Sequence, residues 1–391
     1  MGNEVKRKLQ LIEVIIFTFL ILMRSSVSVL AEEETELRLY ARSAILVDAA
    51  TGRILYEENG HEVMPMASTT KIMTCILAIE SGKLEEYVTV SANADGQPKV
   101  RLGLKEGERY KLKDLLYSLM LESHNDTAVA VAEFVSGSVE KFADEMNAKA
   151  ESLGCEDTFF VTPNGLDATK NGKVHSSTAY DMALIASYAL ENEIFRTIIG
   201  TGQYTFWEAD QKKQYTVYNK DSFLTMYDGA IGVKTGFTND AGYCFVGAVE
   251  EGNARFVSVV LACGWPPNKS WKWADTKVLM DYGTQNYVYK TFISDAEYES
   301  ITVERGVENK VDLCVKREEI GLLLGAEEEI TVEYTLEKSI MAPVEQGMIV
   351  GYEKYVLEGE ILAEYPIVTA ESVDCITFWY IFGKIMQNFM I

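Results

Sequence analysis

The chain has 391 residues, 48% of them hydrophobic, which is enough for one large domain and a smaller one. It carries 36 basic and 59 acidic residues, for a formal net charge of −23. This balance contains no sign of a phosphate-binding surface, so nucleic acid is not expected as a partner.

The N-terminus has the pattern of an export signal. A basic stretch at residues 6–8 precedes the apolar run LIEVIIFTFLILM, and VLA at residues 29–31 precedes an acidic segment. We interpret residues 1–31 as a signal peptide. A retained signal anchor is the alternative, but the apolar run is short beside the roughly 20 residues of a spanning helix. We therefore expect an exported protein.

The next segments predict a hairpin and then a buried helix. Two β-rich runs within residues 43–59 flank the turn DAATG. The segment MASTTKIMTCILAIE follows from Met66 to Glu80, with apolar residues at i, i+3, i+4 and i+7 from Ile72. Its other side is apolar too, so we expect a helix that is buried on most sides.

Further helical patterns cover residues 112–123 and 126–135, and another follows Ser177 or Thr178 as N-cap. The period then changes to two, and GAIGVKTGFT, AGYCFVGAVE and ARFVSVVLAC read as consecutive strands. Helices between an N-terminal hairpin and a C-terminal meander predict an α+β domain over residues 32–288, with both β segments in one antiparallel sheet.

The sequence pattern changes in the rest of the chain. Short strands alternate with charged turns, which predicts a small all-β domain at residues 292–368. The last segment, 373–391, is aromatic and apolar, with Asp374, Thr377, Lys384 and Asn388 near one helical face. We expect an amphipathic helix in the membrane interface, because polar residues interrupt the apolar run. A helix packed on the protein itself is the alternative.

Ser68 and Lys71 form an S-x-x-K pair at the start of the buried helix. Residues at i and i+3 share a helix face, and burial favours a neutral lysine amine, which can take a proton from a hydroxyl. The same spacing recurs at Ser138 and Lys141. That segment is charged, so we expect Ser138 to cap a solvated helix and Lys141 to point to water.

Two more sequence elements carry polar side chains that could take part in the same chemistry. In SHN, Ser123 and Asn125 stand between two helical runs, where they could relay a proton and hold an amide; simple helix capping is the alternative. In KTG, Lys234 lies in a buried-type strand, which is costly unless it faces a cleft. There Lys234 and Thr235 could hold a carboxylate, and Gly236 would admit a substrate backbone. An exposed edge-strand lysine is the alternative.

The cysteines and histidines do not form a recognisable site. Six cysteines are scattered without metal spacing, and three histidines are too few and too far apart for zinc. Cys75, Cys244 and Cys263 lie in apolar runs and are expected in the core. Cys75 is not expected to be a second nucleophile, and the pairing of the cysteines stays open.

The order S-x-x-K, S-x-N, K-T-G resembles that of the serine D-Ala-D-Ala carboxypeptidases, the low-molecular-mass penicillin-binding proteins of peptidase family S11. FVTPNGLD, HSSTAYDMALIA and KTGFTNDAGYCFVG are similar to family segments, as are the β domain and the aromatic tail. The resemblance implies a β-lactamase/transpeptidase-like catalytic domain. His124 departs from the family, which usually has glycine or another residue there.

The resemblance also implies roles. Ser68 would attack the carbonyl between two terminal D-alanines, with Lys71 as base and Ser123 as proton shuttle. Substrate-binding residues would be Asn125, Lys234, Thr235, Gly236 and Phe237, with the N–H groups of Ser68 and Phe237 as oxyanion hole. The implied partners are a peptidoglycan stem peptide, β-lactams and, through the tail, the outer face of the cytoplasmic membrane. No metal or organic cofactor is expected.

One family feature is unassigned. Members often have an arginine after the meander that supports the carboxylate site, but CGWPPNKSWKWAD offers only Lys269 and Lys272. Two rival functions remain on the same fold. A β-lactamase-like hydrolase would need a deacylating group, and no E-x-x-L-N segment lies between SHN and KTG. A non-catalytic wall-binding protein would not need the complete set of three elements.

Overall fold

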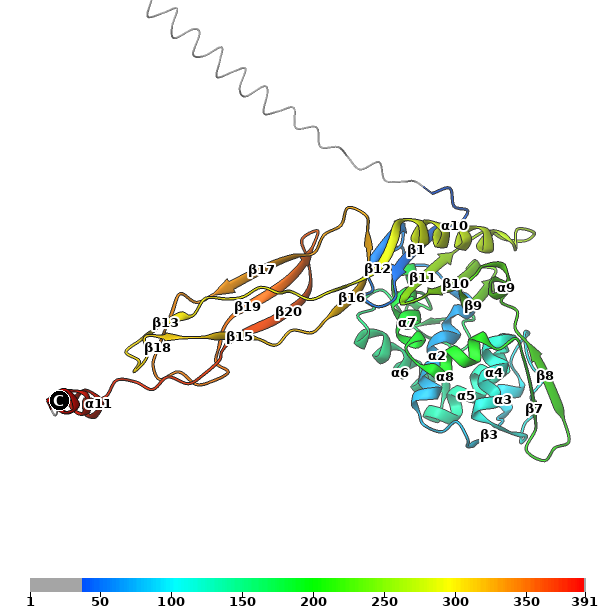
Figure 1. The fold of residues 1–391 in the computed structure, drawn as a ribbon. Coiled ribbons are helices and arrows are strands. Elements are labelled where there is room, and N and C mark those ends of the chain that lie inside the picture. The colour runs from blue at the N-terminus through cyan, green and yellow to red at the C-terminus, as the bar shows by residue number, and fades with distance from the viewer. Residues whose placement is uncertain (1–36, 390–391) are drawn as a thin grey trace, which may run out of the picture. The chain divides into compact units, whose positions relative to one another are not determined.

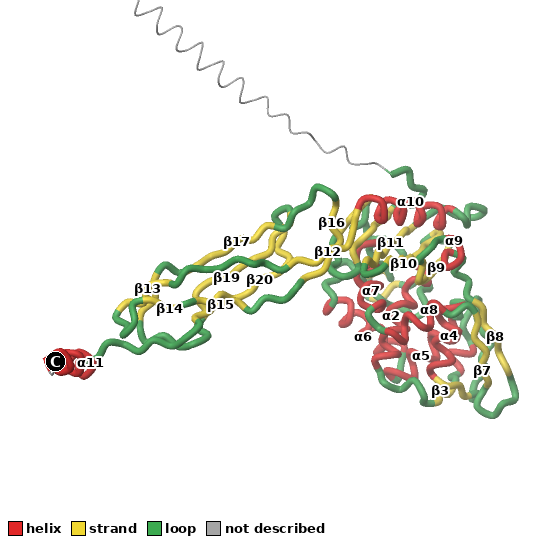
Figure 2. Tube along the Cα trace, viewed as in Figure 1, coloured by secondary structure: helices red, strands yellow, loops and turns green. Residues whose placement is uncertain are grey.

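A computed structural model describes residues 37–389 of the chain, without the side chains of 388 and 389. The predicted signal peptide lies outside the described residues. Figure 1 shows the described elements in chain order, and Figure 2 separates helices from strands. Helices and strands alternate up to residue 286, and strands predominate from there to residue 369.

The central sheet of the large domain joins the two ends of that domain. Its order is β2-β1-β11-β10-β9, and the pairs are antiparallel. The strands are β1 (Ser43–Asp48), β2 (Ile54–Glu58), β9 (Ala230–Thr238), β10 (Gly242–Glu251) and β11 (Ala254–Leu261). The predicted union of the N-terminal hairpin and the C-terminal meander in one sheet is therefore confirmed.

Helices surround α2 on one face of this sheet, and α10 covers the other. Gly283 of α10 packs against Leu46 and Phe256, where an added Cβ would meet their side chains at 2.8 and 2.9 Å. The helical elements are η1 (Ala67–Thr70), α2 (Lys71–Glu80), α3 (Ala92–Asp95), α4 (Leu112–Leu121), α5 (Asn125–Ser136), α6 (Val139–Ser152), α7 (Ala179–Leu190), α8 (Glu193–Gly200), α9 (Phe223–Met226) and α10 (Trp271–Asn286).

The helix α2 is buried nearly all round, as its apolar sides predict. Ile72, Cys75 and Ile76 lie in the main hydrophobic core together with Ile45 and Val257 of the sheet. Burial of each such side chain contributes on the order of 2 kcal/mol to folding. The core therefore fixes the position of α2, and with it the residues at its N-terminus.

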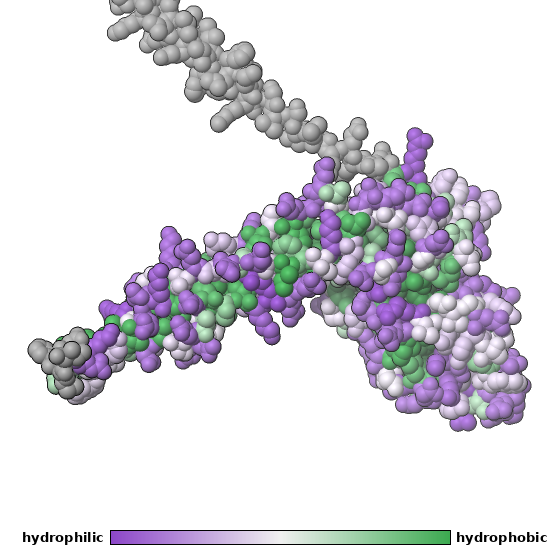
Figure 3. All heavy atoms as spheres, viewed as in Figure 1, coloured by the Kyte–Doolittle hydropathy of each residue, from purple (hydrophilic) through white to green (hydrophobic). Residues whose placement is uncertain are grey.

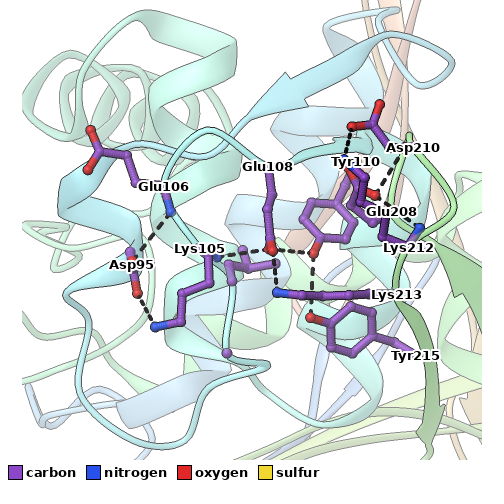
Figure 4. Close-up of polar contacts among 12 residues, drawn as sticks. Asp95, Lys105, Glu106, Glu108, Tyr110, Glu208, Asp210, Lys212, Lys213 and Tyr215 are labelled. Carbon is purple, nitrogen blue, oxygen red and sulfur yellow. Dashed lines mark hydrogen bonds and ion pairs between the residues drawn. The ribbon is translucent and has the colours of Figure 1, made fainter.

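Three two-stranded antiparallel sheets border the helices. They are β3 (Tyr87–Thr89) with β4 (Arg109–Lys111), β5 (Thr169–Lys170) with β6 (Lys173–Val174), and β7 (Gln203–Trp207) with β8 (Gln214–Tyr218). Figure 4 shows how β8 and the turn before it meet β4: Lys213 forms an ion pair with Glu108, and the Tyr215 and Tyr110 hydroxyls lie 3.5 Å apart. These contacts fix one end of the β7–β8 hairpin.

The C-terminal part of the chain is built from strands, which confirms its predicted all-β character. The sheets have the orders β12-β16, β14-β13-β18 and β15-β20-β19-β17. The strands are β12 (Tyr287–Phe292), β13 (Ile301–Glu304), β14 (Lys310–Val311), β15 (Leu313–Val315), β16 (Ile320–Gly325), β17 (Thr331–Leu336), β18 (Ser339–Met341), β19 (Ile349–Leu357) and β20 (Glu360–Thr369). On the face drawn in Figure 3, hydrophobic and hydrophilic patches alternate over these strands.

The terminal helix α11 (Phe378–Phe389) exposes large apolar side chains. Phe378 and Trp379 are 72% and 75% exposed, and Ile381, Phe382 and Ile385 are exposed as well. Within residues 37–389, the structure contains no helix with the length and apolar character needed to cross a membrane. The segment just before α11 belongs to the β domain, because Val373 pairs with Val344 and is buried.

Candidate active site

Ser68 and Lys71 meet where η1 passes into α2. Ser68 lies in the 3-10 helix η1, and Lys71 is the first residue of α2. The Nζ atom of Lys71 lies 2.9 Å from the Oγ atom of Ser68. Ser68 does not cap a helix, since neither η1 nor α2 has a side-chain cap. The geometry therefore favours a nucleophile with its base over the capping alternative.

The polar neighbours of Lys71 match those of a neutral amine. Its Nζ atom lies 3.0 Å from Asn125 Oδ1 and also contacts the carbonyl oxygen of Asn164. These two atoms only accept hydrogen bonds from Nζ, so they take the two N–H groups of a neutral amine. When Lys71 is neutral, its remaining lone pair is available to the Ser68 hydroxyl, whose oxygen also lies 3.4 Å from the Asn164 carbonyl oxygen.

Burial explains why Lys71 would be neutral. Its side chain is 0% exposed. Burial lowers the pKa of the Lys71 ammonium well below its ordinary value; the charge of Lys234 lowers it further, and Asp126 acts in the opposite direction. A lysine amine of this kind can act as a general base near neutral pH.

Asn125 reaches the same place from the junction of α4 and α5, and Ser123 lies two residues before it in the same turn. The backbone of Ser123 has φ +66°, the left-handed region that a serine rarely adopts. Its Oγ atom is buried and has no hydrogen-bond partner among the described residues. Asn125 begins α5 and directs Oδ1 at Lys71, so neither residue serves as a helix cap.

The second S-x-x-K pair behaves differently, as predicted. Ser138 is the N-cap of α6 and accepts a hydrogen bond from the Lys141 N–H group at 3.2 Å. The side chain of Lys141 is exposed. This pair therefore has an ordinary structural role.

Strand β9 brings Lys234, Thr235 and Gly236 beside Ser68. An added Cβ on Gly236 would lie 3.0 Å from the Ser68 nitrogen, so the strand passes directly against the Ser68 backbone. Lys234 is 2% exposed although β9 is an edge strand, which excludes the exposed-lysine alternative. Phe237 is 38% exposed and packs on Tyr243 at 4.6 Å between ring centroids.

Lys234 has two buried charged neighbours. Burial lowers the pKa of Lys234 to about 8; Asp221 acts to raise this pKa, and Lys272 lowers it. The Lys272 ammonium is also buried, over the rings of Tyr243 and Trp273 at 4.8 and 4.6 Å. Burial raises the pKa of Asp221 to about 7. Two lysines and one carboxyl group thus give this end of the site a positive charge.

The segment 161–166 closes the site from the other side, and sequence reasoning missed its role. Asn164 supplies a backbone carbonyl to Lys71. Gly165 has φ +82°, and an added Cβ would lie 2.0 Å from the carbonyl oxygen of Ala67. His175 orders the segment: its Nδ1 accepts the Val161 N–H at 2.9 Å, so its Nε2–H donates to Thr70 Oγ1 at 2.9 Å.

The three elements thus bring together Ser68 with the buried Lys71, the turn that holds Ser123 and Asn125, and the buried strand residue Lys234. A family model described as D-alanyl-D-alanine carboxypeptidase, Peptidase_S11, matches residues 30–264. A second, described as the C-terminal domain of penicillin-binding protein 5, matches residues 287–374. The chain belongs to peptidase family S11.

Known members resemble the chain over most of its length. D-alanyl-D-alanine carboxypeptidase DacF of Bacillus subtilis is 33% identical and aligns over 87% of each chain. DacA of Escherichia coli is 30% identical over 89% of this chain and 86% of its own. Penicillin-binding protein 5 of Haemophilus influenzae has a TM-score of 0.71 and 27% identity, covering 87% of this chain and 99% of its own. The predicted transpeptidase-like fold is confirmed.

Cys75, Cys244 and Cys263 of this S11 protein belong to its core. Each cysteine that the structure describes is a free thiol. Cys75, Cys244 and Cys263 are buried, as predicted, and burial raises the pKa of each thiol. High thiol pKa values disfavour the nucleophilic thiolate at these three cysteines.

Proposed function

We propose that the chain is a serine D-Ala-D-Ala carboxypeptidase that removes the terminal D-alanine from peptidoglycan stem pentapeptides. The observation that carries the proposal is the buried Lys71 amine, which lies 2.9 Å from Ser68 Oγ and 3.0 Å from Asn125 Oδ1. Membership of family S11 supports the substrate class.

In the first half of the reaction, Ser68 Oγ attacks the carbonyl carbon between the two D-alanines while its proton moves to Lys71 Nζ. The N–H groups of Ser68 and Phe237 stabilise the oxyanion. The C–N bond then breaks, and the proton returns through Ser123 to the leaving amine of D-alanine. An ester between Ser68 and the shortened peptide remains.

In the second half, water attacks the ester carbonyl and Lys71 accepts the proton of the water. The C–O bond to Ser68 breaks, Oγ takes its proton back, and the tetrapeptide leaves with a new carboxylate. The buried, unpartnered Oγ of Ser123 is suited to relay protons in both halves, because no other described group competes for it.

The terminal carboxylate of the substrate binds Lys234 and Thr235, and Gly236 lets the substrate backbone lie along β9. Lys272 fits the supporting role that the sequence left unassigned, because its buried ammonium lies near Lys234 and adds to the positive potential there. Such a site selects peptides that end in a carboxylate.

β-Lactams acylate Ser68 by the same first step. Penicillin-binding protein D2 of Listeria monocytogenes, solved in a cefotaxime-bound form, is 30% identical and has a TM-score of 0.56, covering 64% of this chain and 99% of its own. A β-lactamase would go on to release the opened ring quickly, whereas a carboxypeptidase stays acylated for longer.

The protein acts at the outer face of the cytoplasmic membrane, after export through residues 1–31. The apolar side chains of α11 insert into the interface between lipid headgroups and acyl chains, and burial of Phe378 and Trp379 drives binding. The protein is therefore peripheral, held next to its wall substrate.

The test compares two activities of the purified protein. D-alanine release from a peptide that ends in D-Ala-D-Ala is measured beside turnover of penicillin, for wild type and Ser68→Ala. We expect D-alanine release by wild type, slow penicillin turnover, and neither activity in Ser68→Ala. Fast penicillin turnover without D-alanine release would favour the β-lactamase alternative. Neither activity in wild type would favour a non-catalytic wall-binding protein.

A further inference from the structure

His124 stands between two site residues, Ser123 and Asn125, and its side chain is buried. Its Nδ1 atom lies 2.8 Å from the Oγ atom of Ser118 in α4. Ser118 Oγ in turn lies 3.1 Å from Thr127 Oγ1 in α5. A chain of polar contacts therefore joins the two helices that flank the turn.

The other ring nitrogen faces Glu122, the residue on the far side of Ser123. His124 Nε2 lies 3.3 Å from Glu122 Oε2. The other oxygen, Oε1, lies 3.0 Å from Lys220 Nζ and accepts the Tyr218 N–H at 3.2 Å. The side chains of Glu122 and His124, the two neighbours of Ser123, thus contact each other, and Glu122 also contacts the end of the β7–β8 hairpin.

These contacts fix the proton positions on His124. A carboxylate oxygen beside Nε2 places the ring proton there, because a nitrogen lone pair would be repelled. Nδ1 then accepts a hydrogen bond from the Ser118 hydroxyl, and Ser118 Oγ accepts one from the Thr127 hydroxyl. Burial lowers the pKa of His124, so the neutral ring that this arrangement needs is the favoured one.

We propose that His124 is a positioning residue: its contacts with Ser118 and Glu122 hold Ser123 in the left-handed conformation that aims its hydroxyl at the reacting atoms. A backbone at φ +66° persists only when its surroundings enforce it. The proposal rests on the proposed function, because it assigns His124 a task in the same acylation.

The test measures acylation by a fluorescent penicillin, with the rate constant of the chemical step separated from the dissociation constant of the initial complex. We expect His124→Ala to slow the chemical step by about tenfold or more and to leave initial binding unchanged, because Lys234 is not affected. His124→Asn keeps a polar atom near the Nδ1 position and should recover most of the rate. Melting temperatures show whether each variant is folded at the assay temperature.

Two further variants keep the test decisive if His124→Ala does not fold. Ser118→Ala leaves the imidazole and removes only its partner, and should slow the same step. The double variant, with Ser118→Ala and His124→Ala together, should be acylated no more slowly than His124→Ala alone, because both substitutions remove the same contact between Ser118 and His124. His61→Ala is the matched control, because His61 also lies near a glutamate, Glu57, at 3.8 Å but is exposed.

The outcomes separate this proposal from the proposed function. Wild-type rates in His124→Ala and Ser118→Ala would overturn it, and so would a loss confined to melting temperature or to initial binding. A wild-type protein that penicillin does not acylate, and that releases no D-alanine, would overturn the proposed function and the role of His124 with it. Normal acylation in wild type with slow acylation in both variants supports both proposals.

Discussion

Lys71 Nζ lies 2.9 Å from Ser68 Oγ at the buried start of α2, and its other polar neighbours, Asn125 Oδ1 and the Asn164 carbonyl, only accept hydrogen bonds. An ammonium group at Lys71 would donate its three protons to these two oxygens and to Ser68 Oγ. A neutral amine fits the same partners and leaves a lone pair for Ser68. Because burial lowers the pKa of Lys71 well below its ordinary value, the neutral amine is the favoured form.

Replacing Lys71 by arginine tests this assignment. The guanidinium stays protonated in proteins, so it can hold a charge but cannot accept the Ser68 proton. We expect acylation by penicillin to slow by about 10²- to 10⁴-fold, the usual contribution of a general base. Lys141→Arg changes the lysine of the exposed S-x-x-K pair in the same way and should react like wild type. A Lys71→Arg protein that acylates at the normal rate would show that Lys71 is not the base.

The pH dependence of carboxypeptidase activity should be bell-shaped. Lys71 must be neutral, so kcat/KM should rise as pH increases through its lowered pKa. Lys234 must be charged to bind the carboxylate, so kcat/KM should fall as pH increases past about 8, where Lys234 loses its proton. The measurement is D-alanine release across about pH 5 to 10, which spans both limbs. A KM that stays constant through the alkaline limb would contradict the role of Lys234.

Gly165 and Gly172 offer a matched pair of substitutions. Both have positive φ, +82° and +80°, but an added Cβ on Gly165 would lie 2.0 Å from Ala67 O, whereas Gly172 has nothing within 4 Å. Gly172→Ala should cost only the strain of a left-handed alanine, about 1 kcal/mol. Gly165→Ala should also push the backbone at Ser68 out of place and abolish penicillin labelling. Thermal unfolding and labelling of both variants measure the difference, and equal effects would exclude a steric role for Gly165.

Removal of α11 tests the membrane assignment. The truncation should begin at Thr377, because Val373 is buried in the β domain and the Ile376 N–H donates to the Arg305 carbonyl at 2.8 Å. We expect the protein to move from the membrane pellet to the supernatant while its D-alanine release in solution is unchanged. Continued sedimentation of the truncated protein with lipid vesicles would assign binding to another part of the chain.

Several features of the fold could be predicted because they follow from local patterns. The apolar sides of α2, the strand periods of β9 to β11 and the contrast between the two S-x-x-K pairs are visible in the sequence. The predicted helix at 112–123 ends at Leu121 in the structure, and Ser123 turns left-handed two residues later. Sequence periodicity does not reveal such a turn, because a serine rarely adopts it.

The contributions of Asn164, Gly165 and Lys272 could not be predicted, for physical reasons. Asn164 acts through a backbone carbonyl, which every residue has. Gly165 reads as a turn residue, but what requires glycine there is contact with Ala67, which is distant in sequence. Lys272 and Lys269 look alike in the sequence, and only the packing of α10 shows that Lys272 is buried over two aromatic rings while Lys269 is exposed.

The most direct test of the account is to locate the acyl group after reaction with penicillin. The full-length protein is digested, and the modified peptide is identified by mass spectrometry. The account predicts an adduct on Ser68, no adduct in Ser68→Ala, and normal acylation of Ser68 in Ser138→Ala. An adduct on any other residue, or acylation that survives Ser68→Ala, would contradict it.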